Sequence, residues 1–212
     1  MIDELKRGMK LLKYGFNLKS SILLAVLFFL MGIVFIGIDN VTFLLGGTYI
    51  MLGPMMLIQI VVTLISANSV AASPRKRVLE IWIPNLAGLV IMILGYICII
   101  AIAVLKIYQK PALENDYLNN LACMGMLTCI LGIYMSISYK SFLMSILGIA
   151  LAYPTAYVLF GSIKIHLTIV TASLIGFAFI VLGSILSFML RKAFYKKPIS
   201  KYAVGGALRK YM

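Results

Sequence analysis

Acidic residues and histidine are scarce in this sequence. The 212 residues contain 6 Asp or Glu and 1 His against 19 Lys or Arg, and 63% of the chain is hydrophobic. No Asp, Glu, Lys, Arg or His lies well inside any of the long apolar runs. Ion-coupled carriers and intramembrane hydrolases usually need such groups within their spans, where they are costly and are kept for function. Self-powered transport and intramembrane catalysis are therefore not expected.

The sequence also lacks motifs that bind nucleotides or metals. It has no phosphate loop of the form G-x-x-x-x-G-K-[ST], so the chain is not expected to hydrolyse ATP by itself. Its 3 cysteines, Cys98, Cys123 and Cys129, show no C-x-x-C spacing and have no histidine near them in sequence. We interpret them as small buried apolar residues, and His166 as an interfacial polar residue. No catalytic or metal site is expected.

What the sequence does contain is a series of apolar runs of membrane-spanning length. Runs of about 20 apolar residues indicate transmembrane helices. Six such runs are present, at residues 20–38, 41–66, 83–105, 117–138, 142–160 and 167–190. Only short connectors remain, so residues 1–212 are predicted to form a single all-α integral membrane domain without a soluble catalytic domain.

The basic residues fall almost entirely on one side of these six spans. Both termini and the connectors at 67–82 and 139–141 share that side and hold nearly all of the 19 Lys and Arg residues. By the positive-inside rule this side is cytoplasmic, which predicts a multi-pass protein of the plasma membrane with both termini inside. Anionic lipid headgroups account for the net charge of +13, so no nucleic-acid partner is implied.

An amphipathic elbow helix is predicted at the N-terminus, over residues 1–19. Apolar side chains recur there at spacings of three and four: Ile2, Leu5, Met9, Leu12 and Phe16. A helix of this kind lies in the headgroup plane. It serves either as a simple anchor or as a docking element for a cytoplasmic partner, and the pattern favours neither role. At the other end of the chain, residues 191–212 are predicted to form a basic cytoplasmic tail.

A short basic helix is predicted in the connector at residues 67–83. Ser73 can cap a helix N-terminus and Pro74 suits its first position, so "PRKRVLEIW" should form about two turns. Pro84 should then interrupt the helix and let the third span leave at a new angle. A stop-transfer cluster with an interfacial tryptophan explains the charges of this connector, but not a formed helix with protruding apolar side chains.

The order of these parts resembles the permease subunits of ABC type-2 exporters. That family has an elbow helix, six spans with both ends cytoplasmic, and a short helix between the second and third spans. Its motif, a basic run, a Leu-Glu pair and an apolar-Pro-polar step, is similar to "RVLEIWIPN". The small size and the absence of an outer domain are most similar to Gram-positive exporters of amphipathic peptides, such as phenol-soluble modulins and some bacteriocins.

The resemblance implies a half-transporter that has no catalytic site of its own. Two permeases, identical or related, would pair with two cytoplasmic ABC ATPase subunits that bind ATP and Mg. The complex would export hydrophobic or amphipathic substrates, such as peptide toxins or antimicrobials. The short helix would be the coupling helix, with Val78 and Leu79 in an apolar groove of the ATPase and its charged residues at the rim. The candidate contacts are Pro74, Arg75, Lys76, Arg77, Val78, Leu79, Glu80, Ile81 and Trp82.

A partly polar stripe on the second span is a candidate substrate pathway. Its members are Tyr49, Met55, Met56, Gln59 and Thr63. Methionine surfaces repack around varied apolar partners, which suits amphipathic peptides. The alternative, which we favour slightly, is a seam between helices with the polar members bonding across it. On the fifth span, Tyr153 and Tyr157 lie one turn apart and are weaker candidates.

Two other classes of membrane protein fit the sequence less well. A substrate-capturing module of an energy-coupled vitamin uptake transporter also has roughly six spans, but it needs an outward pocket rich in polar contacts. Apart from "KIYQKPALENDYLNN", the connectors on the outer side are only a few residues long. A membrane enzyme has no catalytic constellation to support it.

Overall fold

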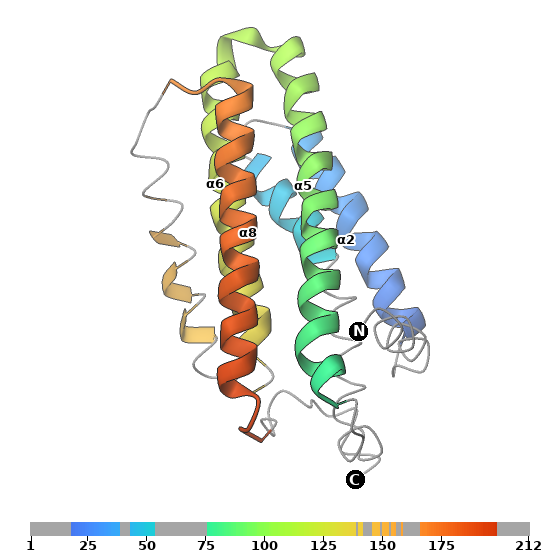
Figure 1. Ribbon diagram of the computed structural model, residues 1–212. Helices are drawn as coiled ribbons and strands as arrows, with labels where there is room; N and C mark the ends of the chain where they lie inside the picture. Colours follow the sequence, from blue (N-terminus) through green and yellow to red (C-terminus); the bar gives the residue numbers. More distant parts are fainter. Residues whose placement is uncertain are drawn as a thin grey trace.

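The part of the chain that the structure describes is entirely helical in its regular elements (Figure 1). A computed structural model describes residues 18–38, 43–53, 76–138, 140–141, 146–148, 150–152, 154–155, 158 and 166–198. The long helices are α2 (Leu18–Ile38), α5 (Ile83–Gln109), α6 (Glu114–Ile137) and α8 (Ile169–Phe194). The shorter elements are the apolar helix Phe43–Gly53, the π turn η2 (Val78–Trp82) and the 3-10 turn η3 (Pro111–Leu113).

Four helical segments are long and apolar enough to cross a membrane. They cover Lys19–Ile38, Val78–Gln109, Pro111–Ile137 and Ile169–Phe194. At a rise of about 1.5 Å per residue, 20 residues reach across a hydrocarbon core of about 30 Å. The first, third, fourth and sixth predicted spans are thus confirmed as helices of spanning length.

The other two predicted spans and the two ends of the chain fall largely outside the described residues. Of the second span the structure describes only Phe43–Gly53, and of the fifth only short pieces between residues 146 and 158. The elbow helix at 1–19 is described only from residue 18, and the basic tail only to residue 198. Six spans, an elbow and a tail therefore stay predictions.

Local sequence explains where the long helices begin and end. After α5, Lys110 leaves the helical conformation and Pro111 starts η3, a position that suits a residue without an N–H. The chain then reverses into α6, so α5 and α6 run antiparallel (Figure 1). At the start of α8, Thr168 and Thr171 form a capping box, in which the Thr171 N–H donates to the Thr168 hydroxyl at 3.3 Å.

Helices α6 and α8 pack with their backbones in direct contact, in what we call the central seam. An added Cβ at Gly125 of α6 would lie 2.2 Å from the Cα of Gly176 of α8. In lipid, where the hydrophobic effect does not drive helices together, small residues allow this close approach and the packing it brings. Glycine is therefore required at position 125 of the seam.

Tyr96 fastens α5 to the central seam. Its hydroxyl donates to the carbonyl oxygen of Leu121 in α6 at 3.0 Å, and its ring meets the ring of Phe177 in α8 edge-on with centroids 5.1 Å apart. An added Cβ at Gly176 would come 1.8 Å from the Tyr96 hydroxyl. One fully buried tyrosine thus joins three helices, and its polar atom is satisfied.

Helix α2 pairs mainly with the short helix Phe43–Gly53. The two backbones approach closely at Gly32, where an added Cβ would lie 2.7 Å from the carbonyl oxygen of Gly46. Only 11% of the spanning window of α2 is buried, against 67% for the segment that contains α6. Much of the α2 surface therefore faces outward from the described bundle.

Candidate functional site at the basic end of the bundle

Most of the described basic residues gather at one end of the bundle, which we call the basic end. This is the lower end in Figure 1, where α5 begins and α6 and α8 finish. Its basic residues on these elements are Lys76, Arg77, Lys140, Arg191, Lys192, Lys196 and Lys197. The uneven charge distribution that the sequence predicted is confirmed for these helices, while the side of the membrane stays a prediction.

The candidate coupling helix is joined to α5 and is not a separate element. Residues 76–77 are helical, η2 follows, and α5 continues without a break, so the expected interruption at Pro84 is wrong. Pro84 lies in the first turn of α5, where a residue without an N–H is tolerated. Directly before it the Ile83 N–H donates to the Val78 carbonyl oxygen, a wide π turn. The expected cap Ser73 lies outside the described residues, as do Pro74 and Arg75.

The middle of this segment is buried within the chain itself. Leu79 is 1% exposed, Glu80 0% and Ile81 2%. The expectation that Leu79 and Glu80 face an ATPase is therefore wrong. By contrast, Arg77 is exposed, while Lys76, Val78 and Trp82 are half-buried.

Two aromatic contacts help to hold this segment against the end of α8. The Trp82 ring packs edge-on against Phe188 with centroids 5.1 Å apart. The Lys76 ammonium lies 5.8 Å from the centre of the Tyr195 ring, within the range of a cation–π contact. The start of the helical run thus rests on α8, which explains why its apolar side chains do not protrude.

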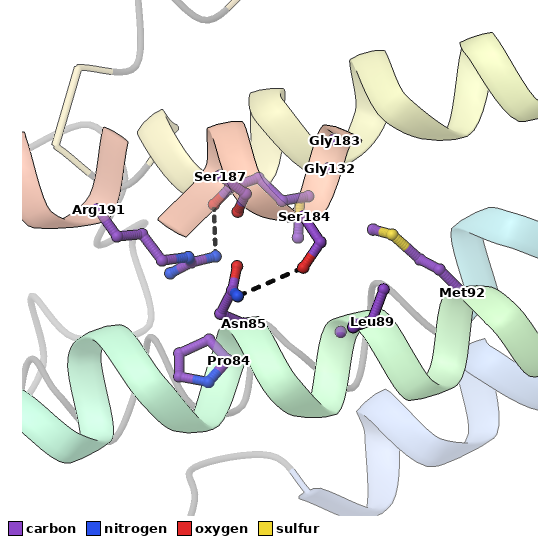
Figure 2. A pocket seen from close by; sticks show the side chains of 11 residues that line it. Pro84, Asn85, Leu89, Met92, Gly132, Gly183, Ser184, Ser187 and Arg191 are labelled. Atoms are coloured by element: carbon purple, nitrogen blue, oxygen red, sulfur yellow. Dashed lines mark hydrogen bonds between the residues drawn. The ribbon is translucent and has the colours of Figure 1, made fainter. Parts of the chain in front are cut away.

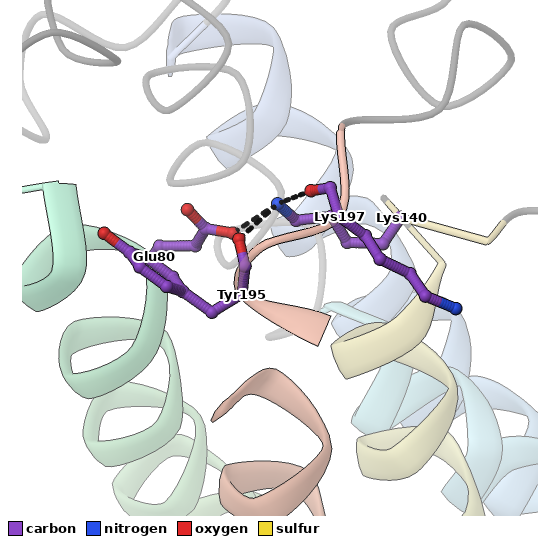
Figure 3. Close-up of polar contacts among 4 residues, drawn as sticks. All are labelled: Glu80, Lys140, Tyr195 and Lys197. Carbon is purple, nitrogen blue, oxygen red and sulfur yellow. Dashed lines mark hydrogen bonds and ion pairs between the residues drawn. The ribbon is translucent and has the colours of Figure 1, made fainter. Parts of the chain in front are cut away.

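A buried ion pair lies at the basic end. Glu80 Oε1 is 2.7 Å from Lys140 Nζ, and the two side chains are 0% and 2% exposed (Figure 3). The same Lys140 ammonium donates to the carbonyl oxygens of Tyr195 at 3.3 Å and Lys197 at 2.5 Å. Carbonyls at a helix C-terminus lack helical partners and favour a cation. Lys140 therefore ties together the start of the α5 run, the connector after α6 and the turn after α8.

The sequence did not predict these roles. The pattern predicts Glu80 at the rim of an interface, and for the connector at 139–141 it predicts only a share of the cytoplasmic positive charge. Two features of the sequence set these residues apart: Lys140 is the single charged residue of its connector, and Glu80 is the single acidic residue of the basic segment. Neither signal names the partner, because the two residues are far apart along the chain.

A small polar niche lies about one helical turn further into the bundle, between α5, α6 and α8. The Asn85 amide donates to the Ser184 hydroxyl at 3.3 Å, and Arg191, 2% exposed, donates to the Met135 carbonyl oxygen at 3.4 Å (Figure 2). The remaining lining residues are Pro84, Gly88, Leu89, Met92, Gly132, Gly183 and Ser187. The cavity has a volume of about 20 Å³, which fits a water molecule and excludes a peptide.

Tyr49 is the one candidate pathway residue that lies within the described part of the chain. Its ring stacks on Phe28 and Phe35 of α2, with centroids 5.7 Å and 5.4 Å apart. This placement favours the seam interpretation at Tyr49. The other candidates, Met55, Met56, Gln59, Thr63, Tyr153 and Tyr157, lie outside the described residues.

The described cysteines and histidine form no metal site. Cys123 and Cys129 are buried, Cys98 is half-buried, and all three are free thiols. His166 is exposed, with Nδ1 3.4 Å from the amide nitrogen of Asn115. Among the described residues no cluster of three His, Cys, Asp or Glu side chains could hold a metal ion.

Comparison with known proteins identifies no family for this chain. No protein-family model, no curated protein and no solved structure matches it. The order of the parts in the sequence and the geometry of the basic end are the features that point to a function.

Proposed function

We propose that the chain is the membrane-spanning permease subunit of an ATP-driven exporter of the ABC type-2 class. In this function it acts without a catalytic site of its own, in a pair of identical or related permeases. Cytoplasmic ATPase subunits bind ATP and Mg and drive export of hydrophobic or amphipathic substrates, such as peptides. Both termini lie in the cytoplasm, on the side of the basic end.

One observation supports this proposal most strongly. The basic segment continues into α5 and is also tied to the ends of α6 and α8. A force applied by a partner to residues 76–78 passes directly into α5, because η2 and α5 form one helical run. It also reaches α8 through Trp82 and the connector after α6 through the Glu80–Lys140 pair. A subunit that is driven from outside requires such a connection.

The partner contact differs from the one that the sequence suggested. Arg77 is exposed and Lys76 and Val78 are half-buried, so these side chains, together with Pro74 and Arg75 before them, form the proposed ATPase contact. Leu79, Glu80, Ile81 and Trp82 transmit the force through internal packing. An exposed basic contact favours an acidic rim on the ATPase.

The test is purification from the native host in mild detergent, followed by mass spectrometry of the bound partners. The expected result is an ABC ATPase in an amount comparable to the permease. Arg77→Glu should reduce the recovered ATPase. Lys192→Glu makes the same charge change at an exposed position on α8 and should not. Recovery of no ATPase, or of an ATPase bound only through a second, unlike membrane scaffold, would contradict the proposal; the latter result indicates an uptake module.

A further inference from the structure

We infer that Glu80 and Lys140 form a latch that holds the basic end closed over the polar niche of Figure 2. When the latch opens, the niche fills with water and α8 separates from α5 at this end. This role goes beyond the proposed function, because it concerns a movement within the chain and does not require an ATPase.

The latch joins three elements at the basic end through short polar contacts. It combines an ion pair of 2.7 Å with two charge-assisted hydrogen bonds to carbonyl oxygens. The contacts inside the niche are longer: Asn85 to Ser184 at 3.3 Å and Arg191 to the Met135 carbonyl at 3.4 Å. Loss of the latch therefore removes the shortest of the polar contacts that the structure describes between these helix ends.

The composition of the niche suits reversible opening. Four polar side chains, those of Asn85, Ser184, Ser187 and Arg191, line it beside apolar residues and glycines, and water can replace the hydrogen bonds of these four. A buried ion pair also differs from close apolar packing, because much of its attraction is offset by the cost of removing both charges from water. When the latch opens, Glu80 and Lys140 regain their hydration, which lowers the free-energy cost of the open state.

The experiment measures the reactivity of a cysteine placed in the niche. Ser187 lines the niche and is 6% exposed, so Ser187→Cys is the reporter. Cys98 and Cys129 are replaced by alanine, and Cys123, 1% exposed, is kept as an internal reporter of the hydrophobic core. The protein is held in nanodiscs without an ATPase, a polar maleimide is added, and peptide mapping separates the two sites.

Lys140→Met is expected to raise the labelling rate at position 187 by about 100-fold, equivalent to about 3 kcal/mol, while Cys123 stays protected. Glu80→Gln should give a smaller rise, because Lys140 keeps its two carbonyl acceptors. Lys192→Gln removes an exposed charge on α8 and should change nothing.

The exchanged pair Glu80→Lys with Lys140→Glu distinguishes a three-way latch from a simple ion pair. A glutamate at position 140 cannot donate to the carbonyl oxygens of Tyr195 and Lys197, so labelling should stay fast despite the restored charges. Slow labelling of the exchanged pair would reduce the latch to the ion pair alone and overturn the three-way assignment.

Two other outcomes would overturn the latch. Unchanged labelling at position 187 in Lys140→Met would show that the pair does not close the niche. Simultaneous labelling of position 187 and Cys123 would show that the pair holds the whole fold together instead of gating one end. If Lys140→Met does not fold, the labelling rates at position 187 and at Cys123 are compared in Glu80→Gln instead. The latch and the proposed function can fail separately. If the labelling results are as expected but the native protein binds no ATPase, only the proposed function is contradicted.

Discussion

The two ends of α8 are packed by different means. In its first half, Gly176 brings the backbone into contact with α6 and Tyr96, and the added methyl of an alanine would have no space. In its last turns, Ser187 and Arg191 border a polar niche, and the carbonyls beyond the helix are held by Lys140. The first arrangement depends on shape and tolerates almost no displacement. The second combines the Trp82–Phe188 ring contact with charges and hydrogen bonds that water can replace, so more movement is expected at the basic end.

The largest effect is expected at the central seam, from Gly176→Ala. The new methyl would lie 1.8 Å from the Tyr96 hydroxyl, so the helices must move apart at a cost of about 3 kcal/mol or more. Thermal unfolding in detergent should show a large loss of stability. The control is Gly37→Ala, where nothing lies within 4 Å of the added methyl, and its effect should be within about 0.5 kcal/mol. Equal stability of the two variants would contradict the close packing of Tyr96 over Gly176.

A second large effect is expected from Leu79→Ala, which tests whether this side chain packs internally. Leu79 is 1% exposed, so its truncation should lower the free energy of unfolding of the isolated chain by about 2–3 kcal/mol. Val78→Ala, at the half-buried neighbour, should cost clearly less. A Leu79→Ala protein as stable as its parent, but unable to bind an ATPase, would restore the exposed coupling-helix interpretation.

A moderate effect is expected from Tyr96→Phe. It removes the hydrogen bond to the Leu121 carbonyl oxygen and keeps the ring contact with Phe177, so the loss should be about 1 kcal/mol. Urea or thermal unfolding would measure it. A loss as large as that of Gly176→Ala would mean that the hydroxyl, and not the fit of the ring over glycine, holds α5 to the seam.

The smallest effect on stability is expected from Arg77→Gln. This side chain is exposed, and an exposed charge contributes at most about 1 kcal/mol to folding. Unfolding of the isolated chain should therefore be nearly unchanged. A substantial loss of stability in the absence of any partner would show that Arg77 belongs to the internal network of the basic end.

The spans are the part of the fold that the sequence predicted best. Apolar length alone located the four helices that the structure describes over a full span, because that length must match the membrane. Their ends were shifted by several residues: the third runs back through η2 to Val78, and α8 continues past its last apolar residues to Phe194. The break expected at Pro84 does not occur, because a proline in the first turn of α5 after a π turn leaves the helix intact.

The candidate site was less predictable, for a physical reason. Leu79 stands between charged residues, and the sequence pattern does not say whether its apolar side faces another protein or the end of its own α8. The Glu80–Lys140 pair depends on how three helix ends meet, which local spacing does not encode. Tyr49 shows the same limit, since a regular stripe on a helix fits both a pathway and the seam with α2 in which its ring stacks.

Hydrogen exchange in nanodiscs tests most directly whether the basic end opens while the central seam stays closed. In the parent protein, backbone amides at residues 121–131 and 172–183 should exchange more slowly than those at 187–197. In Lys140→Met, exchange should accelerate at 78–85 and 187–197 and stay unchanged in the seam. Acceleration in both regions together, or in neither, would contradict the account.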